Sequence, residues 1–82
     1  TEYPASLDTN AKRALYDNLG KNEELAIELD HKIMTTKKDV WRDNKIKTRE
    51  VEYVIKEVLD TFQIKEPDVA YIVELVKNQK DY

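Results

Sequence analysis

The chain has 82 residues, of which 38% are charged and 40% hydrophobic, and its formal net charge is −3. It contains no Cys, one His and one Gly. The lack of Cys excludes disulfides, thiol nucleophiles and Cys-ligated zinc. One His excludes the paired-His zinc helix, and one Gly excludes the glycine-rich phosphate loops. The composition therefore favours a binding or assembly module over an enzyme.

A first helix is predicted to end at Gly20, which supplies the left-handed residue common after a helix. Asp8, Thr9 and Asn10 offer side-chain oxygens that can cap its N-terminus. The apolar residues on its inner face are Ala11, Ala14, Leu15 and Leu19.

A second helix is predicted to begin after Asn22, whose side chain can cap it. Glu23 and Glu24 then lie in the first turn, where the helix dipole favours negative charge. We expect the helix to fray over residues 35–38. Its inner face carries Leu25, Ala26, Leu29 and Ile33.

The third predicted helix has the clearest pattern, because its apolar residues follow helical spacing over three turns. Thr48 is the expected N-cap. The stripe consists of Val51, Val54, Ile55, Val58, Leu59 and Phe62.

A fourth helix is predicted to start at Pro67, since proline is favoured at the first helical position. Val69, Ile72, Val73 and Val76 point inward. The four patterns predict an all-α fold, a small bundle of about four helices, in a single domain over residues 1–82. Because the chain begins at Thr1 without Met, we expect it to be either processed or cut from a larger, multidomain protein.

Several apolar residues lie away from the predicted inner faces. Ile27 and Met34 lie opposite the main stripe of the second helix, Tyr71 and Leu75 form a side stripe on the fourth, and Tyr53 faces away from the core side of the third. A helix with two apolar faces either packs centrally or binds a partner. These stripes are therefore candidate partner interfaces, with central packing as the alternative.

Positive charge is concentrated in the segment from Lys32 to Arg49, where seven basic residues oppose two acidic ones for a net charge of +5. The rest of the chain has seven basic and fifteen acidic residues, or −8. This polarity indicates a phosphate-facing patch, and the alternative is a solvated loop. The candidate DNA-backbone contacts are Lys37, Lys38, Arg42, Lys45, Lys47 and Arg49.

Trp41 lies in the long polar connection between the second and third helices. Its large side chain can cover one end of the core. Alternatively, Trp41 and Arg42 form an interface anchor, because Trp and Arg are enriched at binding hot spots. The five tyrosines are expected at the rim, with their hydroxyls in water.

No catalytic, cofactor-binding or metal site is predicted. His31 has neither Cys nor a second His to share a metal, and Ser6 has no nearby His to activate it. Glu24 and Glu28 lie one turn apart, which on so charged a helix indicates solvated surface. No apolar stretch approaches the roughly 18 residues of a membrane span, so we expect no membrane contact and a cytoplasmic location.

Several ordered phrases of the chain are characteristic. Residues 11–19 read Ala-Lys-Arg-Ala-Leu-Tyr-Asp-Asn-Leu, residues 22–26 read Asn-Glu-Glu-Leu-Ala, and residues 72–82 read Ile-Val-Glu-Leu-Val-Lys-Asn-Gln-Lys-Asp-Tyr. Between them, Asp39, Trp41, Arg42 and Asn44 precede Lys47, Arg49, Glu50 and Val51. Together the phrases resemble, over essentially the whole chain, the C-terminal region of the R subunit of type I restriction enzymes, the HsdR family.

The resemblance implies a parent that is an ATP-driven DNA translocase and endonuclease, using ATP and Mg, and that joins a methyltransferase core of M and S subunits. No nuclease or motor motif of the family maps onto this chain, so the fragment is expected to be non-catalytic and without cofactors. Its expected role is to dock the motor onto the methyltransferase core. The alternatives are a DNA-backbone contact through residues 32–49, or a structural cap on the motor domains of its own chain.

Overall fold

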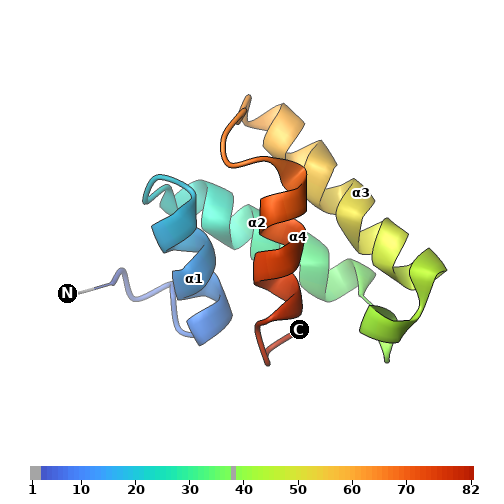
Figure 1. Cartoon of the computed structure of the whole chain (residues 1–82). Helices are drawn as coiled ribbons and strands as arrows, with labels where there is room; N and C mark the ends of the chain where they lie inside the picture. The colour runs from blue at the N-terminus through green and yellow to red at the C-terminus, as the bar shows by residue number, and fades with distance from the viewer. Residues whose placement is uncertain (1–2, 38) are drawn as a thin grey trace.

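A computed structural model describes residues 3–37 and 39–82 (Figure 1). Over these residues it has four α-helices, one short 3₁₀ turn and no strand. This confirms the predicted all-α fold of four helices. The elements are α1 (Asn10–Asn18), α2 (Glu23–Thr36), η1 (Trp41–Asp43), α3 (Lys45–Thr61) and α4 (Val69–Lys77).

The four helices enclose one hydrophobic core. Helix α2 packs against α1 and α3, and α4 packs against the same two helices. In Figure 1, α4 accordingly lies between α1 and α3, while α2 crosses behind them. The inner faces predicted from helical spacing all contribute to this core, with Phe62 and Val69 half-buried against it, whereas Ala14 and Val54 are half-buried outside it.

Two of the predicted caps are present. The Thr9 hydroxyl accepts a hydrogen bond from the Lys12 N–H at 3.1 Å, and the Asn22 side chain accepts one from the Leu25 N–H at 3.0 Å. Gly20 has a φ of 70°, the left-handed conformation expected after α1. These local signals place the starts of α1 and α2 correctly.

The third helix begins earlier than predicted. The Asn44 side chain accepts hydrogen bonds from the backbone N–H groups of Ile46 and Lys47, both at 3.0 Å, so Asn44 is the cap. Thr48 lies inside α3, where its buried hydroxyl donates to the Trp41 carbonyl at 2.7 Å. The prediction of Thr48 as the cap is therefore wrong, because its hydroxyl is used in a tertiary contact.

Two further helix ends differ from the prediction. Asp68 caps α4 by accepting from the Tyr71 N–H at 3.0 Å, so the helix begins at Val69 instead of at Pro67. Helix α2 stays regular through Thr36 and does not fray at residue 35, and Lys38 lies outside the described residues.

Three buried hydrophobic residues come from outside the predicted stripes: Leu7, Trp41 and Tyr82. Tyr82 is only 5% exposed, and its hydroxyl donates to Asp30 inside the molecule. The expectation that all tyrosines lie at the rim is therefore wrong for Tyr82, because the C-terminal segment bonds to Ala11 of α1 and to Asp30 of α2.

Candidate functional site

The outward face of α3 carries the most exposed large apolar side chains among the described helices. Ile46 is 72% exposed and Tyr53 is 66% exposed. The two residues are seven positions apart, or two helical turns, so they lie on the same side of the helix. Ile46 reaches this face because the Asn44 cap starts α3 at Lys45, which places Ile46 in the first turn.

Between this face and the end of α2 lies an open groove of about 650 Å³. Its lining is mainly apolar, with Val54 half-buried beneath the exposed Ile46 and Tyr53. The groove is lined by Thr36, Ile46, Arg49, Glu50, Tyr53 and Val54.

The side chains that line this groove are of the kind that can contact another protein surface. An apolar surface edged by an Arg and a Glu can bury the apolar side of a partner while forming ion pairs at its rim. Among residues 3–37 and 39–82, no group of three or more His, Asp or Glu side chains is placed to hold a metal ion.

The predicted partner residues do not form one surface. Ile27 and Leu75 are half-buried and pack against the core, whereas Met34 is 48% exposed. Tyr71 is 50% exposed, but its hydroxyl donates to the Asn18 side chain at 2.8 Å and so ties α4 to α1. In the described part of the chain, α3 offers a larger apolar face than either predicted stripe.

Trp41 is 2% exposed and covers the end of the core, which matches the first of its two interpretations. It offers no indole surface to a partner. Arg42 lies over the indole ring, with its guanidinium carbon 5.1 Å from the ring centroid. Its Nε and Nη2 donate to the carbonyls of Lys77 and Gln79 at 2.9 and 2.6 Å, so Arg42 braces the end of α4 against η1.

The basic segment is divided by the fold. Arg42, Lys45 and Arg49 line a hollow together with Lys77 of α4, and Asp43 and Glu52 line the same hollow. Lys47 instead donates to the Asp39 carbonyl at 3.2 Å. Lys37 follows the last turn of α2, and the candidate contact at Lys38 lies outside the described residues.

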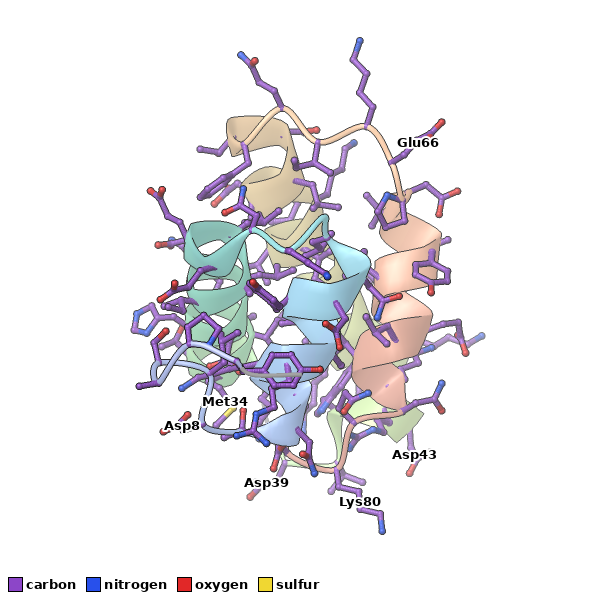
Figure 2. All side chains as sticks on the ribbon, turned by 90° about the vertical axis from the view of Figure 1, so that its left-hand side faces the viewer. Asp8, Met34, Asp39, Asp43, Glu66 and Lys80 are labelled. Atoms are coloured by element: carbon purple, nitrogen blue, oxygen red, sulfur yellow. The ribbon has the colours of Figure 1, made fainter. Side chains whose placement is uncertain are left out.

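Lys80 extends this basic surface, since it lines a second hollow with Arg42 and Lys77. Figure 2 shows Lys80 and Asp43 at one end of the molecule and Glu66 at the opposite end. Charge patterning along the sequence does not indicate Lys77 and Lys80, because they lie about thirty positions beyond the basic segment, in an acidic part of the chain.

Ile46 is a second site residue that the predicted helices do not indicate. A helix capped by Thr48 leaves Ile46 in the preceding connection, away from the stripe that carries Tyr53. The Asn44 cap signal, followed by the seven-residue spacing from Ile46 to Tyr53, would have identified the exposed stripe.

No helix in the described part of the chain is long and apolar enough to cross a membrane. In comparisons with known proteins, the chain matches no family model, no curated protein and no solved structure.

Proposed function

We propose that this chain is a non-catalytic assembly domain that joins protein subunits through the groove on α3. The observation that carries this proposal is the open apolar groove between the end of α2 and the exposed Ile46 and Tyr53. Leaving two such side chains in water on a highly charged helix gains nothing for folding, whereas burying them against a partner is favourable.

The resemblance to the HsdR family supplies a specific partner. On that basis, the domain docks an ATP-driven restriction motor onto its methyltransferase core in the cytoplasm. The ordered phrases described above support this partner, and the exposed groove supports a docking role.

The test is calorimetric binding of the chain to the methyltransferase core. Combining Ile46→Glu with Tyr53→Glu should weaken binding about tenfold or more, because truncating a central interface aromatic typically costs over 1 kcal/mol. Tyr71→Glu is the matched control, since it makes the same change at an exposed tyrosine on another helix. Unchanged binding by the double variant would refute docking through α3.

If the domain instead serves as a structural cap on the motor domains of its own chain, we expect a different result. In that case the double variant would lower the stability of the intact parent R subunit. Its binding to the methyltransferase core would be unchanged. Unfolding measurements on the parent therefore separate the two roles.

A second candidate function is contact with the phosphate backbone of DNA. The observation that favours it is the meeting of Arg42, Lys45 and Arg49 with Lys77 at one end of the bundle, extended by Lys80, where these five basic residues outnumber the two acidic ones, Asp43 and Glu52. Each phosphate contact adds about 0.9 to the slope of log affinity against log salt.

Lys77→Gln with Lys80→Gln should therefore flatten the salt dependence of binding to a random duplex. Lys21→Gln with Lys65→Gln is the control of equal charge, placed on loops away from this end. If both pairs change the slope equally, only the net charge matters and the basic end is not a binding site.

A further inference from the structure

The outward face of α3 is too small to hold a stable complex by itself. The face of one helix about 25 Å long and about 10 Å wide covers about 250 Å². Each partner of a stable protein complex buries about 800 Å². A partner that docks on Ile46 and Tyr53 must therefore also cover surface beside the groove.

Arg49 joins the groove to the basic end of the bundle. It is exposed, and its side chain lines both the groove and the hollow between α3 and the end of α4. Arg42 and Lys77 in turn line both that hollow and the adjoining one, which includes Lys80. The groove and the two hollows therefore form one continuous surface, which runs from Tyr53 over the start of α3 to the end of α4.

The two hollows give this surface a strong positive charge. Their lining has five basic and two acidic side chains, or +3: Arg42, Lys45, Arg49, Lys77 and Lys80 against Asp43 and Glu52. The rest of the chain has nine basic and fifteen acidic residues, or −6. Helix α3 begins at Lys45, so the positive end of its dipole adds to the same region. Negative charge on a partner is therefore favoured here.

The groove also meets a hollow at its opposite end, because Tyr53 lines both. Charged side chains nearly balance in that hollow, where Lys56 lies with Glu57 and Asp60 for a net charge of −1. The charge of the continuous surface is thus concentrated on one side of the apolar residues. This asymmetry fixes how a partner is oriented, with its acidic side over η1 and the end of α4.

We infer that the partner docks with an apolar patch that is bordered on one side by Asp and Glu side chains. The apolar patch covers Ile46 and Tyr53, and the acidic border lies over the basic end. This inference rests on the proposed docking through α3 and states the chemistry of the partner surface. An apolar centre with a charged border is the usual anatomy of a protein interface. In this arrangement the basic end contacts the carboxylates of a protein and not the phosphates of DNA.

Association kinetics test the role of the basic end. Lys77→Gln with Lys80→Gln should slow association with the methyltransferase core about threefold or more at about 0.1 M salt, because charges at an interface border act mainly on the association rate. The difference should disappear at about 1 M salt, where screening acts within about 3 Å. Lys21→Gln with Lys65→Gln is the control of equal charge. Equal slowing by both pairs would mean that only the net charge matters and would overturn the inference.

Carbodiimide crosslinking identifies the groups that the basic end contacts. The reagent joins a lysine amine to a carboxylate through an amide bond where the two form an ion pair, within about 4 Å. In the complex with the methyltransferase core, Lys77 and Lys80 should form amide bonds with Asp or Glu side chains of a core subunit, whereas Lys21 and Lys65 should not. Mass spectrometry of the digested complex locates the bonds. Bonds at all four lysines alike, or none at Lys77 and Lys80, would contradict the inference.

The outcomes separate this inference from the two proposed functions. If Ile46→Glu with Tyr53→Glu abolishes core binding while the Lys77 and Lys80 variant associates normally, only the acidic border is refuted. Unchanged core binding by the Ile46 and Tyr53 variant refutes docking through α3, and the inference falls with it. If the Lys77 and Lys80 variant flattens the salt dependence of duplex binding but leaves core association unchanged, the basic end contacts DNA and the inference is wrong.

Discussion

The hydroxyl of Tyr82 donates a hydrogen bond to Oδ1 of Asp30 at 2.5 Å, which joins the last residue of the chain to the middle of α2. Both residues are buried, with exposed fractions of 5% and 9%. The neighbouring Asp81 carboxylate accepts from the Ala11 N–H at 3.1 Å, so the same segment also holds the start of α1. The C-terminal residues therefore connect α1 and α2, which also pack against each other.

Tyr82→Phe should lower the free energy of unfolding by about 1–3 kcal/mol, because a buried acceptor loses its donor. The measurement is urea denaturation at neutral pH. Tyr53→Phe is the matched control, since it removes an exposed hydroxyl and should change stability by less than about 0.5 kcal/mol. Equal effects of the two variants would show that the Tyr82–Asp30 bond adds no stability.

The stability of the chain should fall at alkaline pH. Burial, and then the hydrogen bond to Asp30, raise the pKa of Tyr82 above its ordinary value of 10.0. Above about pH 10, the unfolded chain releases the Tyr82 proton while the folded chain keeps it. The stability contributed by this group is thus complete below the unfolded pKa and is lost as the pH rises toward the folded pKa.

The expected slope from Tyr82 is about −1.4 kcal/mol per pH unit. It is measured by denaturant unfolding between pH 9 and pH 11.5. Tyr82→Phe should remove this part of the slope, and a variant with the same pH dependence as wild type would contradict the assignment.

Arg42→Ala should lower the free energy of unfolding by about 1–2 kcal/mol, because it removes two charge-assisted hydrogen bonds that are partly screened by water. Arg42→Lys should recover little of the loss, since an ammonium cannot reproduce the two-point contact with the Lys77 and Gln79 carbonyls. Denaturation followed by Trp41 fluorescence measures both. Full rescue by the lysine variant would show that charge, and not geometry, matters at this position.

Asn44→Ala should cost about 1 kcal/mol of stability, because the backbone N–H groups of Ile46 and Lys47 at the start of α3 lose their acceptor. Asn44→Asp should retain most of this stability, since its carboxylate can accept the same bonds. Thermal denaturation of the two variants measures the difference. If the alanine variant is as stable as wild type, the cap does not hold the start of α3.

The helices and their inner faces follow from the sequence alone, because capping and helical spacing involve residues only three or four positions apart. Asn22 and Gly20 mark helix ends in the sequence and in the structure, and Val51, Ile55, Val58 and Leu59 of the predicted stripe are buried. The remaining features required tertiary structure. Packing decided that Trp41 is covered, that Lys77 lies beside Arg42, and that Thr48 bonds to the Trp41 carbonyl.

The candidate site depends both on the local sequence and on tertiary packing. The sequence by itself placed Tyr53 on the outer side of the third helix, because that position follows from the helical period. The groove beside it was decided only when the end of α2 packed against α3 and the cap at Asn44 placed Ile46 two turns away. Likewise, the Tyr82–Asp30 bond spans 52 positions of the chain. Contacts over such distances depend on how whole helices pack, and no local pattern of residues encodes them.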